Sequence, residues 1–333
     1  QLTSYERPYP MLVLTGGDCF ERPDLVDLIE YAVGKGLHVS ISPSVTPLFT
    51  RERVKAVQDA GVSVMSMSLD GGSAETHDAF RGFPGTFDRT IEACHMLNEL
   101  GMRFQLNTVF TAKNIHEAPQ MLKNAIDLGA FMFYTFMLVP TGRGQHLDML
   151  TPHEREDVLH WLHDNSTRIA IKTTEAPQYR RIAFQREAVR QGKAAPAKHG
   201  ELYHWLTKET HELLGENIEE PRPPRTPLAI NSGSGFAFID HTGDVYPSGF
   251  LPIHCGSIKD TPFPQIYRES EVFRALRNPS GFEGKCGACE FNHFCGGSRS
   301  TAYAMTGNYL ASDPSCAHIP AGYTGELPEG IER

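Results

Sequence analysis

The stretch MLVLTGGD at residues 11–18 decides the fold class, because an apolar run of strand length ends there in two glycines and a carboxylate. An amphipathic helix pattern follows at 22–35. Four more strands are predicted at 38–42, 62–70, 103–110 and 131–140, and four more helices at 51–60, 87–100, 115–128 and 152–163. Strands that alternate with helices form a parallel sheet with right-handed crossovers. The sequence therefore predicts an α/β domain of five strand–helix units, too few to close an eight-unit barrel.

The composition is that of a soluble globular protein. Hydrophobic residues make up 40% of the 333 residues and charged residues 21%, and no apolar run is long enough to span a membrane. The formal net charge of -9 provides too little positive field for a nucleic-acid binder, so a small molecule or a peptide is the expected partner. The opening QLTSYERPYP shows no secretion signal, and we expect a cytoplasmic protein without membrane contact.

A change in composition marks the end of the strand–helix repeat. Residues 166–227 combine KTTEAPQYRR, a charged helical run and the Pro-rich EEPRPPRTP, which predicts a crossover or linker with helices. Residues 228–333 contain SGFAFIDHTGDVYPSGF at 234–250, a β-hairpin pattern with its turn at Gly243. We therefore predict three parts, namely a sheet domain over 1–165, the crossover, and a small C-terminal domain.

Seven cysteines are present, and four of them have the spacing of a metal site. Within a Gly-rich stretch the pattern C-x2-C-x5-C-x20-C is formed by Cys286, Cys289, Cys295 and Cys316. Four thiolates suit a tetrahedral zinc ion as well as a [4Fe-4S] cluster, so the spacing leaves both open. An odd count in a chain of this length argues against a disulfide scaffold. Cys19, Cys94 and Cys255 are predicted to be buried thiols rather than ligands.

Polar residues gather where the predicted strands end, and in parallel α/β folds ligands bind at these carboxyl ends. The candidates are Gly16, Gly17, Asp18, Ser44, Ser68, Asp70, Asn107 and, in the loop after the third strand, Arg81. Taken singly each has an ordinary alternative, since GGD stretches form tight turns, serines cap helices and arginines are usually surface cations. Together a carboxylate, hydroxyls and a cation suit a zwitterionic ligand, whose carboxylate Arg81 would clamp.

The order of these motifs resembles the S-adenosylmethionine (AdoMet) radical enzymes, the radical SAM superfamily. LTGGD, SLDG with HDAFRG after it, LNTVFT and PTGRG carry the resemblance in the first half of the chain. The C-terminal hairpin and cysteines resemble the SPASM or twitch extension, which holds auxiliary iron-sulfur clusters. KTTEAPQYRR and the stretch from HTGDVYPSGFLPI to CEFNHFCGGSRSTAYAMTGNYL are similar to the branch of the heme d1 and alternative heme pathways.

The resemblance implies a role for most of these residues at the strand ends, here called the rim residues. Gly16, Gly17 and Asp18 would correspond to the GGE motif that holds the amino group of AdoMet. The ribose or carboxylate of AdoMet would be contacted by Ser44, Ser68, Asp70 and Asn107. Its adenine would lie near Val139. The four spaced cysteines would hold an auxiliary [4Fe-4S] cluster. Ser248 stands where many SPASM domains have a cysteine, which favours one auxiliary cluster over two.

One motif of the superfamily is absent from the sequence, the C-x3-C-x2-C that binds the catalytic [4Fe-4S] cluster. Only ten residues precede the strand at 11–15, so we expect the first βα unit and this motif to lie upstream of the chain. A relative that has lost the cluster is the alternative. The expected fold is a partial (β/α)6-type radical SAM barrel with an open edge at 11–15. A small β-hairpin and iron-sulfur domain would pack against its carboxyl-end opening.

The implied chemistry is reductive cleavage of AdoMet to a 5′-deoxyadenosyl radical that takes a hydrogen atom from the substrate. Flavodoxin or ferredoxin would be the electron donor, and the substrate a small molecule, a tetrapyrrole or a peptide. Transfer of the 3-amino-3-carboxypropyl group of AdoMet would use nearly the same rim residues and stays open. The sequence assigns no catalytic residue. The alternative from another class is a binding module with a structural zinc site.

Overall fold

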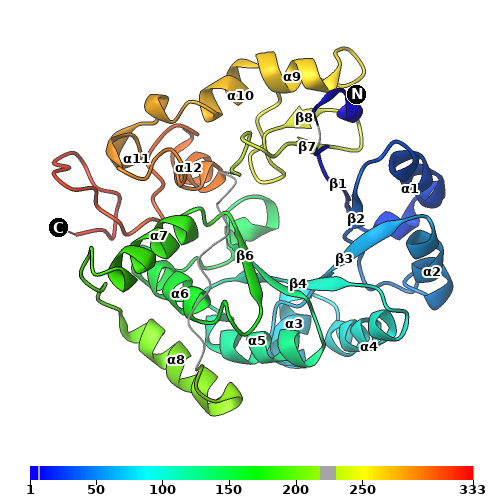
Figure 1. Ribbon diagram of the computed structural model, residues 1–333, viewed down its shortest axis with the longest axis horizontal. Helices are drawn as coiled ribbons and strands as arrows, with labels where there is room; N and C mark the ends of the chain where they lie inside the picture. The colour runs from blue at the N-terminus through cyan, green and yellow to red at the C-terminus, as the bar shows by residue number, and fades with distance from the viewer. Residues whose placement is uncertain (7, 218–229, 333) are drawn as a thin grey trace.

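The computed structural model of the chain describes residues 1–6, 8–217 and 230–332. Its centre is a parallel six-stranded sheet with the strands in chain order (Figure 1). The strands are β1 (Leu12–Leu14), β2 (Val39–Ile41), β3 (Val62–Ser68), β4 (Phe104–Phe110), β5 (Met132–Met137) and β6 (Ala170–Thr174). The sheet is open, with β1 and β6 at its edges, as the predicted partial barrel requires. The open, parallel α/β sheet expected from the sequence is therefore confirmed.

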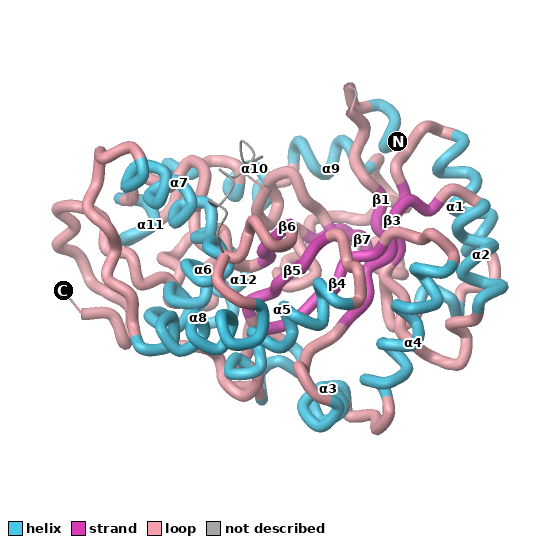
Figure 2. Tube along the Cα trace, turned by 60° about the horizontal axis from the view of Figure 1, so that its bottom comes forward, coloured by secondary structure: helices cyan, strands magenta, loops and turns pink. Residues whose placement is uncertain are grey.

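Eight helices connect and follow these strands within the described residues. They are α1 (Leu25–Gly34), α2 (Arg51–Asp59), α3 (Ala74–Arg81), α4 (Thr86–Glu99), α5 (Ala118–Asp127), α6 (Pro152–Asp164), α7 (Gln178–Arg190) and α8 (Glu201–Leu214). Figure 2 shows the strands in the middle of the molecule, with helices beside them. Local signals fix several helix starts: the Thr50 side chain accepts from Arg53 N at the start of α2, and Thr151 and Glu154 form a capping box at α6.

The two faces of the sheet differ in burial because side chains alternate along each strand. On β4, Phe104, Leu106 and Phe110 are buried in the main core, whereas Gln105 and Asn107 on the other face are half-buried. β5 repeats the pattern, with Phe133 buried and Tyr134 half-buried. One face thus packs against helices, and the opposite face, here called the inner face, keeps side chains accessible.

The sixth strand corrects the expected count of five. β6 lies in the segment 166–227, which was predicted as a crossover with helices; α7 and α8 are the helices there. Thr135 pairs with Thr173 and Phe136 with Thr174, so β6 belongs to the sheet. The sequence AIKTT has little hydrophobic alternation, because β6 is an edge strand whose residues are all exposed or half-buried. The boundary predicted near residue 227 lies outside the described residues.

The C-terminal part contains the predicted hairpin. Strands β7 (Phe238–Ile239) and β8 (Val245–Tyr246) are antiparallel, and Gly243 in the turn between them has φ of 93°, which glycine adopts without strain. Four short helices follow: α9 (Phe263–Glu269), α10 (Glu271–Leu276), α11 (Gly284–Ala288) and α12 (Arg299–Thr306). A small separate core is formed by Val245, Phe263, Ile266 and Phe273.

The cysteine-bearing segment packs at the carboxyl end of β6, as expected from the sequence. Glu175, the first residue after β6, accepts hydrogen bonds from Ser298 Oγ at 2.6 Å and Ser300 Oγ at 3.0 Å. Gln178 Nε2 donates to Asp313 Oδ2 at 2.6 Å and adds a second connection. In the part of the chain that the structure describes, no helix has both the length and the apolar character needed to cross a membrane.

Candidate functional site

The turn after β1 brings three of the predicted rim residues together. Ser44 Oγ donates to the Gly17 carbonyl at 2.6 Å, and Asp18 Oδ1 accepts from Ser44 N at 3.4 Å. Asp18 also caps the following turn by accepting from Phe20 N at 3.1 Å. Gly16 has φ of 150°, and a Cβ on either glycine would meet nothing within 4 Å, so the turn leaves its backbone accessible to a ligand.

Thr46 is a member of this group that the sequence did not indicate. Its Oγ1 donates to Asp18 Oδ2 at 2.6 Å and fixes the carboxylate from the second oxygen. Asp18 is only 9% exposed, yet within the described residues no cation pairs with it. A buried carboxylate that has only neutral donors is suited to accept an ammonium group from a ligand.

Asp70 and Arg81 meet at the end of β3, but they pair with one another. The Arg81 guanidinium forms an ion pair with the fully buried Asp70 carboxylate, whose Oδ1 also accepts from Val109 N at 2.8 Å. His77 Nδ1 accepts from Asp70 N at 3.0 Å, and burial lowers the pKa of His77, so the ring is neutral at pH 7. Because Asp70 already occupies Arg81, the predicted clamp on a ligand carboxylate would have to use the remaining N–H groups of Arg81.

Ser68 and Asn107 lie side by side on the inner face. They are paired residues of β3 and β4, and the same register row continues to Tyr134 on β5 and Lys172 on β6. Gln105 Nε2 donates to Asn107 Oδ1 at 2.8 Å and orients that amide. Val139 is buried just beyond β5, and no hydrogen bond in the described part joins it to the other rim residues.

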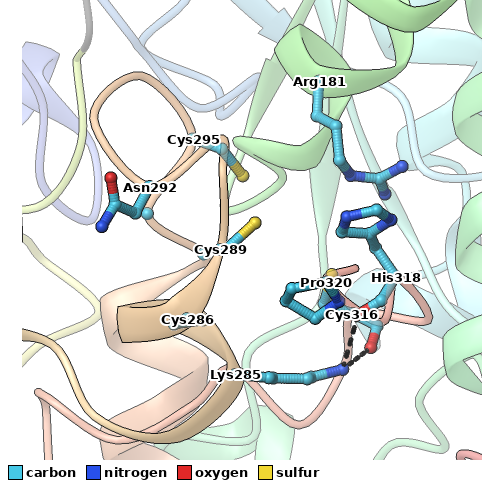
Figure 3. A pocket seen from close by; sticks show the side chains of 11 residues that line it. Arg181, Lys285, Cys286, Cys289, Asn292, Cys295, Cys316, His318 and Pro320 are labelled. Carbon is cyan, nitrogen blue, oxygen red and sulfur yellow. Dashed lines mark hydrogen bonds between the residues drawn. The ribbon is translucent and has the colours of Figure 1, made fainter. Parts of the chain in front are cut away.

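The four spaced cysteines line one pocket. Cys286 lies on α11, Cys289 directly follows that helix, and Cys295 and Cys316 come from two loops, all as free thiols. Figure 3 shows the sulfur atoms of Cys289 and Cys295 pointing into the same space as Arg181 and His318. Gly297 is needed for this closeness, since its φ is 66° and a Cβ there would lie 3.0 Å from Cys286 Sγ.

Three buried cations surround these thiols, and the cysteine spacing gave no indication of them. Arg181 is 2% exposed and binds Glu156 with two hydrogen bonds of 2.8 and 2.6 Å. Lys285 is equally buried and donates to the carbonyl groups of Cys316 and His318. Arg299 Nη2 donates to Cys286 Sγ at 3.5 Å. Buried cations favour a metal group that, with four thiolates, carries net negative charge.

The thiols also accept backbone hydrogen bonds. Asp313 N donates to Cys286 Sγ at 3.3 Å, and Phe291 N donates to Cys289 Sγ at 3.4 Å. Burial raises the pKa of Cys316 to about 11, against the opposing effect of Arg181 and Lys285, and also raises that of Cys289 to about 11. Cys289 and Cys316 are therefore protonated at pH 7 unless a metal displaces their protons. Donor set, hydrogen bonds and charge fit a zinc ion or an iron-sulfur cluster.

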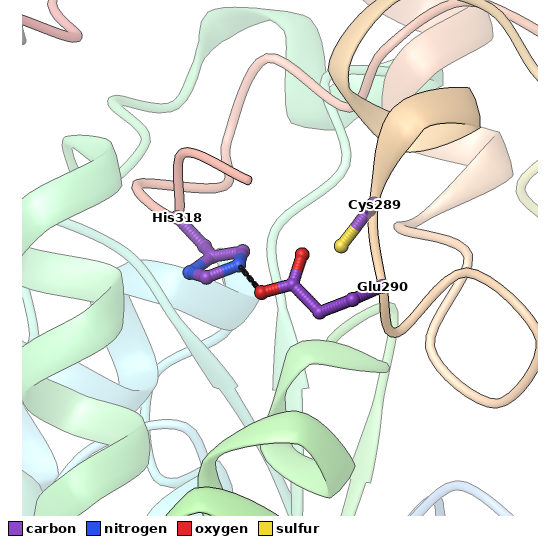
Figure 4. Close-up of side chains that lie close together, drawn as sticks. All are labelled: Cys289, Glu290 and His318. Atoms are coloured by element: carbon purple, nitrogen blue, oxygen red, sulfur yellow. Dashed lines mark hydrogen bonds and ion pairs between the residues drawn. The ribbon is translucent and has the colours of Figure 1, made fainter. Parts of the chain in front are cut away.

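His318 lines the pocket together with the four thiols, and Figure 4 shows it near Cys289 and Glu290. Cys289, Glu290 and His318 place one ligand atom each within 4.8 Å of one another, and His318 Nε2 lies 3.2 Å from Glu290 Oε1. His318 follows Cys316 by two residues in CAH, which is the signal that sequence reasoning passed over. A nitrogen atom of His318 and an oxygen atom of Glu290 therefore lie close to the sulfur atom of Cys289.

The remaining cysteines lie apart from this pocket. Cys19 and Cys94 are buried in the main core, as predicted, and burial raises the pKa of each to about 12. Cys255 is half-buried and its thiol donates to the Ile253 carbonyl at 3.4 Å. Within the described residues no second group of three cysteines is assembled, so this part of the chain provides no set of cysteine ligands for a cluster that would cleave AdoMet.

Comparison with known proteins shows the family and the fold of the chain. Residues 2–125 match the family model of the radical SAM superfamily. The AdoMet-dependent heme synthases of Oleidesulfovibrio alaskensis and Methanosarcina barkeri are each 39% identical to the chain over 93% of its length, and it covers 75% and 83% of theirs. The structure of Streptococcus suis SuiB bound to S-adenosylmethionine has the same fold, with a TM-score of 0.61 and 12% identity over 92% of the chain and 66% of SuiB. Because relatives of 39% identity match over most of both chains, the chain belongs to the radical SAM superfamily of enzymes.

Proposed function

We propose that the protein cleaves AdoMet to modify a tetrapyrrole, with one auxiliary [4Fe-4S] cluster bound by Cys286, Cys289, Cys295 and Cys316. The observation that carries the proposal is the pocket in which these cysteines meet three buried cations, at the carboxyl end of β6. The 39% identity to AdoMet-dependent heme synthases supports a tetrapyrrole substrate. The free thiols also suit a reducing compartment, and we place the protein in the cytoplasm.

AdoMet would lie across the carboxyl ends of β1 to β5. Asp18 would accept its ammonium group, and the open backbone at Gly16 and Gly17 would lie against it. Hydroxyl and amide groups for the ribose and carboxylate would come from Ser44, Ser68 and Asn107, and Asp70 would act mainly by holding Arg81 in place. Val139 would provide an apolar contact for adenine. When bound, the cofactor supplies one-electron chemistry at the substrate.

The residues of the cysteine pocket would hold the auxiliary cluster and tune it. Lys285 and Arg299, which form no ion pair within the described residues, would offset its negative charge, and the N–H groups of Asp313 and Phe291 would donate to its thiolates. Both effects stabilise the more negatively charged, reduced form of a cluster. Flavodoxin or ferredoxin would supply electrons to the enzyme.

Metal analysis of anaerobically reconstituted protein tests the proposal. We expect about four irons and four sulfides at the cysteine site. Cys289→Ser should remove most of this iron. The matched control Cys94→Ser changes a buried thiol of the main core, far in sequence from the four cysteines, and should retain the iron. One tightly bound zinc and no sulfide would instead support the binding module with a structural zinc site. Iron content equal in the two variants would contradict the ligand assignment.

One alternative concerns the substrate and a second concerns the reaction. SuiB has also been solved with its precursor peptide SuiA, at a TM-score of 0.60, so the same fold accommodates a peptide. Transfer of the 3-amino-3-carboxypropyl group would cleave a different C–S bond of AdoMet. The products separate the two chemistries, because hydrogen abstraction leaves 5′-deoxyadenosine and methionine, whereas group transfer leaves 5′-methylthioadenosine.

A further inference from the structure

The inner face of the sheet changes character between β4 and β5. On β3 and β4 it carries Ser66, Ser68, Gln105 and Asn107, which are hydroxyl and amide groups. The register row of Ser68 and Asn107 continues to Tyr134 on β5 and Lys172 on β6, and Phe136 lies two residues further along β5, in the row of Val109 and Thr174. The proposed AdoMet site uses none of Tyr134, Phe136 and Lys172. The second half therefore offers aromatic surface and a cation next to a polar half.

The aromatic side chains in this half lie close to one another. The ring centroids of Tyr134 and Phe136 are 4.7 Å apart, and that of Phe250, from the loop after β8, is 6.5 Å from Phe136. Phe250 is 37% exposed, and Tyr134 and Phe136 are half-buried. Aromatic groups that stay accessible at the end of a sheet where ligands bind are suited to stack against a flat apolar ligand.

Lys172 is the cation of this surface. Its Nζ lies 4.7 Å from the centroid of the Tyr134 ring, and the Tyr134 hydroxyl is bound to Thr174 Oγ1, which fixes the ring beneath it. Lys172 is exposed, and no carboxylate of the described residues forms an ion pair with it. An accessible lysine held over a ring and lacking an acidic partner can bind an anionic group of a ligand.

We infer that Lys172 binds a carboxylate side chain of the substrate while Tyr134, Phe136 and Phe250 contact its ring plane. The substrate class is then a flat, apolar macrocycle with carboxylate side arms. This inference rests on the proposed function and adds the recognition surface to it. Because Phe250 belongs to the C-terminal part and the other three residues to the sheet, the surface exists only when the two parts are packed together.

Fluorescence quenching on reconstituted protein tests the inference with two porphyrin probes. Coproporphyrin III carries four carboxylates, and its tetramethyl ester has the same ring without charge. Lys172→Ala should weaken binding of the acid about tenfold, as expected for the loss of one charge-assisted contact, and leave binding of the ester unchanged. Phe136→Leu should weaken binding of both probes. Lys198→Ala, at an exposed lysine in the loop between α7 and α8, is the matched control and should change neither.

The outcomes separate the inference from the function it rests on. If the unmodified protein binds neither probe, the tetrapyrrole assignment is wrong and the inference falls with it. If it binds the acid and Lys172→Ala binds equally well, the inference alone is overturned. AdoMet affinity and the melting temperature of Lys172→Ala, measured in parallel, should match the unmodified protein, which shows that a loss of probe binding is local.

Discussion

At the scale of single residues, Glu175 connects the two parts of the molecule. Among the described residues it is the one non-glycine with positive φ, at 57°, a conformation that costs about 1–3 kcal/mol unless its surroundings impose it. Ser298 and Ser300 donate to its carboxylate, and Arg155 donates to its carbonyl group. These bonds hold the chain in the turn that connects β6 to α7.

Glu175→Gln should change how stability depends on pH. Burial raises the pKa of Glu175 above its ordinary value of 4.5, against the opposing effect of the Ser298 and Ser300 hydroxyls. The folded state therefore binds the proton more tightly than the unfolded state. Below pH 4.5 the contribution of this group to the free energy of unfolding is fully present and does not change with pH. It is lost as the pH rises from there through the raised pKa.

The glutamine variant lacks this titration, so urea unfolding between pH 4 and 8 should show a shallower decline than in the unmodified protein. Glu175→Ala should instead lose about 1–3 kcal/mol across the range, because it leaves buried hydroxyls without their acceptor. Parallel pH profiles for the glutamine variant and the unmodified protein would contradict the raised pKa.

The residue scale also shows what spacing alone can predict. Cys286, Cys289, Cys295 and Cys316 were found because metal ligands recur at short, fixed intervals along a chain. Arg181 and Arg299 could not be predicted as part of the site, because an arginine in a sequence is usually a surface cation. Only the packing of α7 and α12 buries these two side chains. The ion pair of Asp70 with Arg81 was missed for a similar reason: both residues were assigned to a ligand rather than to each other.

At the scale of elements, α12 has a glycine near each of its two ends, and the two glycines have different surroundings. Gly297, just before its N-cap Ser298, has φ of 66°, and a Cβ there would lie 2.7 Å from Asp313 Cβ. Gly307 at the other end has φ of 75°, and a Cβ there would meet nothing within 4 Å. The first therefore brings the chain close to the cysteine pocket, and the second only ends the helix.

Gly297→Ala should lower the iron content of reconstituted protein, because Cys286 and Asp313 must move apart to admit the methyl group. Its free energy of unfolding should fall by more than about 2 kcal/mol, from the positive φ and the overlap together. Gly307→Ala carries the conformational cost alone, about 1 kcal/mol, and should keep its iron. Equal iron loss in both variants would show that strain in α12, rather than closeness to the pocket, is responsible.

The elements also show why β6 was not predicted while β1 to β5 were. A strand covered on one face reveals itself by alternating apolar residues, as in Phe104, Leu106 and Phe110 of β4. β6 has two exposed residues, Ala170 and Lys172, and three half-buried residues over AIKTT, because it pairs only with β5. Its place in the sheet follows from its backbone pairing, which no pattern of side chains records.

At the scale of the whole molecule, the sheet separates two sites. The Asp18 carboxylate is held by groups of the β1 and β2 turns, at one edge, and the cysteine segment packs on Glu175 beyond β6, at the other. Neighbouring strands lie about 4.8 Å apart, so the sites are on the order of 20 Å from each other across the curved sheet. No hydrogen bond or ion pair found in the described residues joins Asp18 to the four cysteines.

The two sites should therefore respond independently to substitution. Asp18→Ala should weaken AdoMet binding about tenfold or more in titration calorimetry, because the ammonium group loses its carboxylate, while iron at the cysteine site stays unchanged. Cys289→Ser should do the reverse, removing iron and retaining AdoMet affinity. Thr46→Val, which removes only the hydroxyl that orients Asp18, should give a smaller loss of AdoMet affinity. If either variant impaired both properties while its melting temperature stayed unchanged, the sites would be coupled through the sheet, and the separation inferred from the strand order would be wrong.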